Sequence, residues 1–244
     1  MRFSASRIAT LLGHFGADQR QEAILEVWQR ANPVSLQRAL ERKQVVPIQV
    51  PERVELLLQQ PCTTPQQVAE RKVQVQEALK SEPAQPAPIA KALREHAERE
   101  INTGFGIVRE SPVVQRFEAQ FGQAVQLDPQ LYVKEFGKVV LQGKIDGRLA
   151  DGRILEVKNR VRGLFHTVRR YEMMQVQTYL ELLDAPSAIL CEAYRDQLAW
   201  HEVARDTDWF NQHVLEPLSA LHDQLSELWT DAEMQDKLFE GKLF

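Results

Sequence analysis

Apolar residues in the first hundred positions recur every three or four residues, which is the period of an amphipathic helix. The pattern is clearest over 18–31. The pairs Asn32-Pro33 and Thr64-Pro65 each place a capping residue before a proline at the first helical position. We therefore expect helices over 18–31, 33–40, 65–80 and 89–100, with a proline-rich loop over 81–88.

The middle of the chain mixes this period with the two-residue alternation of strands. Ser111-Pro112 carries a helix start signal, and Gly122 is typical of a helix end. We expect helices over 111–121 and 167–183, and strands over 131–136, 138–149, 153–158, 188–194 and 197–203. This order predicts an α/β fold in which a central mixed sheet of about five strands is flanked by helices.

The last segment, about 206–244, predicts a long helix with an apolar stripe. The stripe comprises Val214, Leu218, Leu221, Leu225 and Leu228. Such stripes usually pack on the core, so we expect this one to cover the sheet. A contact between copies of the chain is the alternative.

Composition narrows the class of protein. The chain has 244 residues, ordinary globular hydrophobicity of 43%, and no apolar run long enough to cross a membrane. We read no signal peptide, so we expect an intracellular protein of cytoplasm or nucleus. Two distant cysteines, Cys62 and Cys191, exclude a zinc finger or a locally bound iron–sulfur cluster.

The formal net charge of −4 hides an uneven distribution. Residues 104–172 hold 12 basic and 8 acidic side chains, whereas residues 173–244 hold 4 basic and 14 acidic ones. The middle is therefore basic and the tail acidic. Nucleic-acid-binding proteins are often basic overall, but this chain can only be basic locally.

The segment 143–158 carries the candidate chemistry. Glu156 and Lys158 share a strand face because side chains alternate. A two-residue loop at Asp151-Gly152 would pair Asp146 with Val157 and place it on the far face. A three-residue loop from Ala150, with Gly152 in the left-handed conformation, pairs Asp146 with Glu156. We favour the second, although Asp146-Gly147 could itself be a turn and Glu156 and Lys158 a solvated face.

Two adjacent carboxylates repel each other and attract a hard divalent cation. Mg²⁺ takes oxygen ligands and commonly uses one or two carboxylates together with substrate phosphate. A lysine beside them can hold or activate the attacking water and neutralise charge on the pentavalent phosphorus group. Asp146, Glu156 and Lys158 therefore form a suitable set for phosphodiester hydrolysis.

The Asp146…Glu156-Val157-Lys158 arrangement resembles the PD-(D/E)XK nuclease superfamily, although Ile145 stands where its proline would be. Further blocks resemble the phage lambda exonuclease type, the YqaJ-like viral recombinase nucleases. These blocks are Ser4-Ala5-Ser6-Arg7, the Gly106–Glu110 segment followed by Phe117-Glu118, and Gln175-Val176-Gln177-Thr178-Tyr179. The resemblance covers most of 4–179 and says little about 33–98 or the acidic tail.

The resemblance implies a restriction-endonuclease-like core in one domain, 1–244, with a helical insertion at about 33–98 and acidic C-terminal helices at about 206–244. It implies that Glu110, Asp146, Glu156 and the main-chain carbonyl of Val157 bind Mg²⁺, for which Mn²⁺ can substitute. Lys158 would position the water, and Gln175 or Gln177 would orient it or a phosphate oxygen. The implied DNA contacts are Ser6, Arg7, Arg109, Arg148, Arg160, Arg162, Arg169, Arg170 and Tyr179.

Simpler interpretations exist for several of these residues. Glu110 precedes Ser111-Pro112, where the dipole of a starting helix favours an acid. Ser6 could cap a helix. Gln175 and Tyr179 share a helix face, but the sequence does not choose between Gln175 and Gln177.

We therefore predict a Mg²⁺-dependent deoxyribonuclease, foremost a 5′–3′ exonuclease on linear double-stranded DNA in recombination or end processing. The alternatives are a structure-specific or single-strand nuclease of the same superfamily, and a non-catalytic DNA-binding or assembly module. Duplex DNA ends are the expected partner. The resemblance also allows a homotrimer and a single-strand annealing partner, and no membrane association is expected.

Overall fold

Two β-sheets form the centre of the computed structural model, which describes residues 1–44, 50–81 and 87–243 without the side chains of 87–92, 107 and 109. The larger sheet has the order β2-β5-β6-β7-β8. Its strands are β2 (Val125–Leu127), β5 (Gly147–Leu149), β6 (Ile154–Asn159), β7 (Ser187–Tyr194) and β8 (Gln197–Ala204). Within this sheet only β6 and β7 pair in parallel. The sheet is therefore mixed and five-stranded, as predicted, but it contains β2 in place of the predicted strand 131–136, which lies in the other sheet.

The smaller sheet has the order β1-β4-β3, with β1 (Arg2–Ser4), β3 (Tyr132–Phe136) and β4 (Val139–Gly143). The predicted strand 138–149 is therefore wrong as a single element, because β4 and β5 belong to different sheets. The chain leaves β4 at Gly143, where the Tyr179 ring packs so closely that an added Cβ would lie 2.5 Å from its Cε1 atom. Strands β1 and β2 were not predicted, because three residues are too few to show a period.

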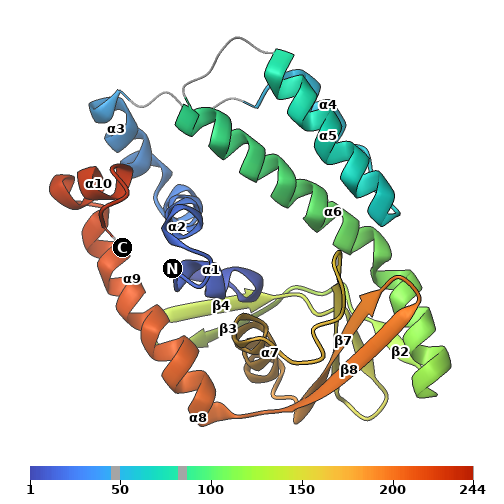
Figure 1. Cartoon of the computed structure of the whole chain (residues 1–244). Helices are drawn as coiled ribbons and strands as arrows, with labels where there is room; N and C mark the ends of the chain where they lie inside the picture. Colours follow the sequence, from blue (N-terminus) through green and yellow to red (C-terminus); the bar gives the residue numbers. More distant parts are fainter. Residues whose placement is uncertain (45–49, 82–86, 244) are drawn as a thin grey trace.

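Helices surround both sheets (Figure 1). The chain starts with a 3₁₀ turn, η1 (Ala5–Arg7), and α1 (Ile8–Leu11), which pack against α7 (Arg170–Leu183). Next come α2 (Ala17–Ala31) and α3 (Pro33–Lys43), close to the predicted bounds. The Asn32 side chain caps α3 by accepting a hydrogen bond from the Ser35 N–H at 3.2 Å.

One 35-residue helix, α6 (Ala87–Phe121), replaces the two predicted helices 89–100 and 111–121. Of the predicted loop 81–88, residues 82–86 lie outside the described residues. Pro112 lies inside α6, although proline removes a helical hydrogen bond. Phe105, Val113 and Phe117 are all buried, and this packing on both sides of the proline overrides its breaking effect.

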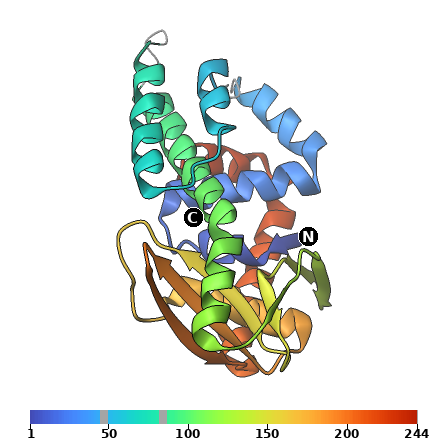
Figure 2. The same cartoon turned by 90° about the vertical axis from the view of Figure 1, so that its right-hand side faces the viewer.

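The upper part of α6 forms a small helical unit with α4 (Glu52–Leu58) and α5 (Pro65–Ser81) (Figure 2). This unit has its own core, which includes Val54, Val68, Val75 and Ile101. Helix α3 instead packs on α2 and belongs to the main core through Leu36 and Ala39. The extent of the predicted insertion at 33–98 stays a prediction.

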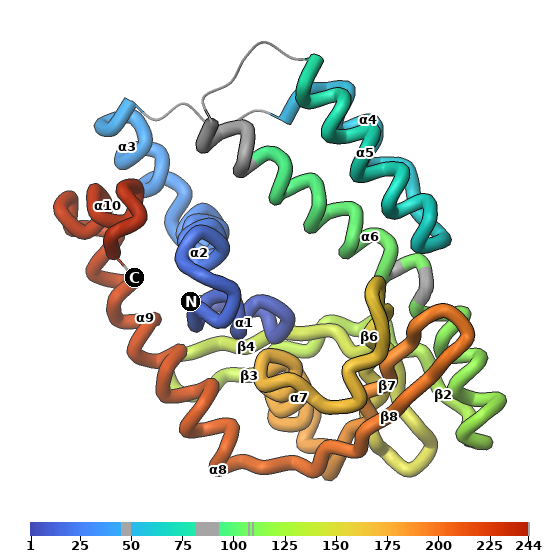
Figure 3. Tube along the Cα trace, in the orientation of Figure 1, coloured from blue at the N-terminus to red at the C-terminus, as the bar shows by residue number. Residues whose placement is uncertain are grey.

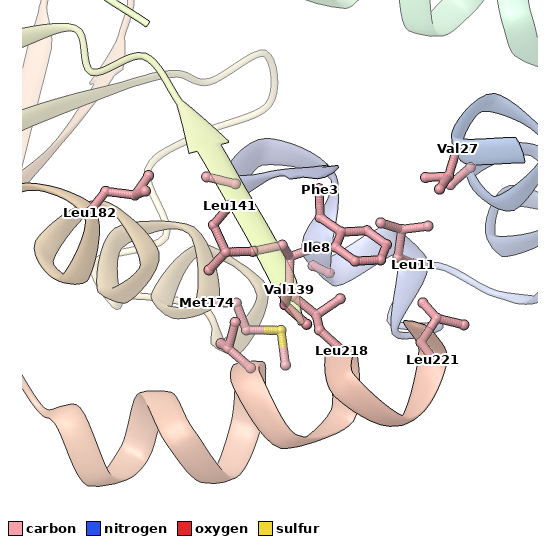
Figure 4. Packing of buried hydrophobic residues seen from close by; sticks show 14 of the residues in the cluster. Phe3, Ile8, Leu11, Val27, Val139, Leu141, Met174, Leu182, Leu218 and Leu221 are labelled. Atoms are coloured by element: carbon pink, nitrogen blue, oxygen red, sulfur yellow. The ribbon is translucent and has the colours of Figure 1, made fainter. Parts of the chain in front are cut away.

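The tail consists of α8 (Thr207–Phe210), the π-helical η2 (Asn211–Leu215), α9 (Glu216–Leu228) and α10 (Ala232–Phe239). The whole predicted stripe, from Val214 to Leu228, is buried. Leu218 and Leu221 lie beside Phe3, Leu11 and Val139 (Figure 4). The stripe therefore packs within the chain, as expected, but it covers α1 and β4 of the smaller sheet rather than the five-stranded one. Among the described residues no helix is long and apolar enough to span a bilayer.

Candidate active site

The hairpin between β5 and β6 has the register that aligns two carboxylates. Gly147 pairs with Leu155 and Arg148 with Ile154, which brings Asp146 opposite Glu156. The connection is the three-residue loop 150–152, closed by a hydrogen bond from the Gly152 N–H to the Leu149 carbonyl at 3.0 Å. Gly152 has φ +87°, which residues other than glycine rarely adopt. The glycine therefore fixes the register that the sequence favours.

A hydrogen-bonded cluster occupies this end of the hairpin. The Lys158 ammonium donates to Glu156 Oε1 and to Gln175 Oε1, both at 2.7 Å. The Gln175 amide donates to Glu156 Oε1 at 2.9 Å and to the Tyr179 hydroxyl at 2.8 Å. Asp146 Oδ2 accepts a hydrogen bond from the Val157 N–H at 2.6 Å. Strand β6 and helix α7 thus hold the side chains of Glu156, Lys158 and Gln175 in fixed orientations.

Burial and mutual repulsion act on the carboxylates of the cluster. Burial raises the pKa of Asp146 to about 8, and the negative charge of Glu156 adds to the shift. Burial, and to a smaller extent the negative charge of Glu156, also raise the pKa of Glu110 on α6. The Glu110 carboxyl is therefore close enough to Glu156 for their charges to interact. For Lys158, burial opposes the charged form, but the charges of Glu156 and Asp146 outweigh it and raise the pKa. The site thus gathers three carboxyl groups beside a single lysine, an arrangement in which a bound cation would favour the ionised carboxylates.

A second observation indicates that these residues could bind a divalent cation. Glu156 is 3% exposed, and its Oε2 atom is buried without a hydrogen-bond partner among the described residues. A buried, unpartnered carboxylate oxygen is costly unless something binds it. No three acidic, histidine or cysteine side chains of the described residues form a ready-made metal cage. Mg²⁺ needs only one or two carboxylates, because water and substrate phosphate complete its shell.

The two candidate glutamines have different surroundings. Gln175 belongs to the cluster, whereas Gln177 is buried and joins α7 to the end of β8. The Gln177 amide donates to the Ala204 carbonyl at 2.7 Å, and its oxygen accepts from the Asp206 N–H at 2.9 Å. The prediction of Gln177 as a catalytic residue is therefore corrected, since its polar atoms are already bonded to backbone.

Two predicted DNA contacts are also corrected. Tyr179 is 4% exposed, so it is not accessible to DNA. Its hydroxyl accepts a hydrogen bond from the Gln175 amide and thereby holds that side chain in the cluster. The Arg160 guanidinium is buried between Glu192 Oε2 at 2.7 Å and Glu172 Oε1 at 2.6 Å. It is not free to bind phosphate. Glu192 was not predicted as part of this site. The feature that could have indicated it is its position as the one charged residue in the otherwise mainly apolar strand β7.

Glu192 also fixes the loop that follows β6. It accepts a hydrogen bond from the Phe165 N–H at 2.8 Å and contacts His201 Nε2 at 2.9 Å. Arg160 lies over the Phe165 ring at 4.1 Å. The segment 160–169 is therefore attached to the sheet next to the cluster.

The other predicted DNA contacts differ in availability. Arg7 pairs with Glu26 at 2.6 Å, and Arg148 donates to the Tyr132 hydroxyl at 3.3 Å, so neither is free. Ser6 is exposed on η1, where its hydroxyl lies 3.2 Å from that of Ser4. Three further arginines are exposed and form no ion pair with the described part of the chain: Arg162, Arg169 and Arg170. The side chain of Arg109 lies outside the described residues.

Comparison with known proteins identifies the fold. Neither a protein-family model nor the sequence of a curated protein matches the chain. The structure of an alkaline exonuclease, LHK-Exo from Laribacter hongkongensis, aligns with a TM-score of 0.51 and 14% identity, covering 93% of this chain and 91% of that chain. LHK-Exo in complex with dAMP aligns with a TM-score of 0.45 and 15% identity over 72% of this chain and 87% of that chain. The first alignment establishes an exonuclease-like α/β fold.

Proposed function

We propose that this chain is a metal-dependent DNA nuclease that hydrolyses phosphodiester bonds. The observation that carries the proposal is the state of Glu156. One of its oxygens is held by Lys158 and Gln175, while the other is buried without a partner beside the protonatable Asp146. The similarity of the fold to an exonuclease supports the same activity.

The residues have distinct roles in this proposal. Asp146 and Glu156 would hold Mg²⁺, with the Val157 carbonyl and Glu110 as further proposed ligands. When bound, the cation supplies a water of lowered pKa and neutralises charge on the phosphate. Lys158 would donate a hydrogen bond toward the attacking water and stabilise the negative charge that develops on the phosphoryl oxygens. Gln175 keeps the lysine and Glu156 in place.

The finer proposal is an exonuclease on linear double-stranded DNA with 5′–3′ polarity, acting in recombination or end processing. Its support is the set of motif blocks in the sequence and the exonuclease-like fold. A homotrimer and a single-strand annealing partner belong to the same proposal.

The activity is tested with end-labelled linear duplex and covalently closed circular duplex, each with Mg²⁺, Mn²⁺ or chelator. We expect loss of the linear duplex with metal and persistence of the circle. No cleavage of either DNA with any divalent metal contradicts the nuclease proposal. Cleavage of the circle contradicts the exonuclease proposal but not the nuclease one. Labels on the 5′ or 3′ end then give the polarity.

Matched aspartate variants connect the activity to the site. Asp146→Asn should abolish cleavage, whereas Asp151→Asn, in the exposed turn of the same hairpin, should retain it. Equal activity in the two variants would show that the cluster is not the catalytic site.

A further inference from the structure

Helix α1 lies beside α7 (Figure 3). Phe15, in the turn that follows α1, contacts the half-buried Tyr171 at the start of α7. The Phe15 and Tyr171 rings meet edge to face, with centroids 5.1 Å apart and an interplanar angle of 61°. Phe15 is 41% exposed even though it is a large apolar side chain. The ring therefore has surface available for a planar ligand.

The pair lies next to the candidate active site. Tyr171, Gln175 and Tyr179 follow one another at intervals of four residues on α7, so they share one face of the helix. Gln175 contacts both Lys158 and Glu156. Tyr171 is consequently about one helical turn, roughly 6 Å along the axis, from the amide that organises the site.

Positive charge surrounds the pair. Arg169 and Arg170 are exposed at the start of α7 and form no ion pair with described residues, although the Arg169 guanidinium lies over the Phe165 ring, 4.6 Å from its centroid. Burial and then the charge of Arg170 lower the pKa of His14, the residue before Phe15, which indicates that Arg170 lies near it. The adjacent acid, Glu172, is buried and paired with Arg160, so it does not neutralise this surface. The combination of the exposed Phe15 ring and guanidinium groups without an ion-pair partner among the described residues matches a strand of nucleic acid, which offers bases to stack and phosphates to bind.

We propose that Phe15 and Tyr171 form a stacking site for one unpaired nucleobase, belonging to the DNA strand whose phosphate lies at Glu156 and Lys158. This inference rests on the proposed nuclease function. It narrows the substrate to a strand that is single-stranded or frayed beside the scissile phosphate. Stacking accepts every base, so the site imposes no sequence preference. Arg169 and Arg170 bind the phosphates that flank the stacked base.

The test measures stacking without cleavage. A short single-stranded oligonucleotide with 2-aminopurine near its end is titrated with protein in chelator, and both its affinity and its fluorescence are recorded. We expect the wild type to quench the fluorophore. Phe15→Leu keeps an apolar side chain but removes the ring, so it should abolish the quenching and weaken binding roughly five- to hundredfold, the range for loss of one stacked base. Phe15→Trp should restore both.

Trp200→Leu is the matched control, because Trp200 is a similarly exposed aromatic residue, 43%, that packs on Phe117 and Phe121 instead. It should bind and quench like the wild type. Tyr171→Leu is the second variant and should reproduce the effect of Phe15→Leu. It carries the test if circular dichroism shows that Phe15→Leu has altered folding.

The outcomes separate this inference from the proposed function. Normal quenching and affinity in both leucine variants, or an equal loss in Trp200→Leu, would overturn the stacking site even if the wild type degrades DNA. Quenching that depends on Phe15 in a protein that cleaves no DNA with any metal would keep the stacking site and overturn the nuclease.

Discussion

The cost of ionising Asp146 can be measured as a pH-dependent change in stability. Burial and the nearby Glu156 charge raise the pKa of this carboxyl from 3.8 to about 8 in the folded protein. Between these values the folded state keeps a proton that the unfolded state has lost. The free energy of unfolding of the metal-free protein therefore falls as the pH rises from about 4 to about 8.

Asp146→Asn removes this titration. An asparagine oxygen can still accept the hydrogen bond from the Val157 N–H, so the variant mimics the protonated aspartic acid. A shift of about four pKa units at ~1.4 kcal/mol per unit sets a ceiling of about 6 kcal/mol for the stabilisation at pH 8. At pH 4 the variant and the wild type should be about equally stable.

Urea unfolding in chelator at pH 5, 6.5 and 8, followed by circular dichroism, gives the free energies of unfolding. Asp151→Asn is the control, because hydrogen bonds from Arg153 lower the pKa of that exposed carboxyl. It should show no gain at pH 8. An Asp146→Asn variant that is no more stable than the wild type at pH 8, or whose gain is the same at every pH, would refute a buried, proton-retaining carboxyl. Mn²⁺ should raise the unfolding temperature of the wild type and not of Asp146→Asn, because it binds only the folded state.

The other predictions concern single side chains of the cluster and its support. Lys158→Ala should abolish cleavage in the end-labelled DNA assay while DNA binding, measured by filter retention, persists; near-normal cleavage would show that the site is wrongly assigned. Gln175→Ala should lower kcat without changing the free energy of unfolding. Gln177→Ala should keep its kcat but lower the free energy of unfolding, measured in urea, by ~1–3 kcal/mol, because it leaves buried backbone groups unpaired. Arg160→Ala should cost ~3–5 kcal/mol, because two buried carboxylates lose their partner; a fully stable variant with weaker DNA binding would restore Arg160 as a phosphate contact.

Local features of the sequence predicted local features of the structure. Gly152 predicted the hairpin loop, because a three-residue connection needs one left-handed residue. Asn32 predicted the start of α3, because its side chain satisfies a free N–H of the first turn. In both cases the determining interaction lies within a few residues, so it can be read without knowledge of the fold.

The errors arise where distant parts of the chain meet. Pro112 is a helix breaker by local rules, but packing between α6 and β6 keeps α6 continuous through it. Arg160 is an ordinary surface arginine by local rules, yet it pairs with Glu192, which is 32 residues away. Neither partner can be inferred without the sheet topology that brings β6 beside β7.

The choice between Gln175 and Gln177 has the same cause. Two positions along a helix differ by about 200° around its axis, so these side chains point in nearly opposite directions. Which one faces the carboxylates depends on how α7 is rotated against the sheets. That rotation is set by packing, including the close approach of Gly143 to the Tyr179 ring.

The structure also changes what the net charge of −4 means for DNA binding. Acids of the tail pair with basic residues away from the cluster, Asp223 with Lys138 at 2.5 Å and Asp236 with Lys43 at 2.8 Å. The repulsion that an acidic tail would exert on a phosphate backbone is thus partly neutralised within the chain, and screening weakens the rest with distance. The guanidinium groups of Arg162, Arg169 and Arg170 have no such partners among the described residues. The sign of the charge beside the cluster, rather than that of the whole chain, therefore decides whether DNA can approach it.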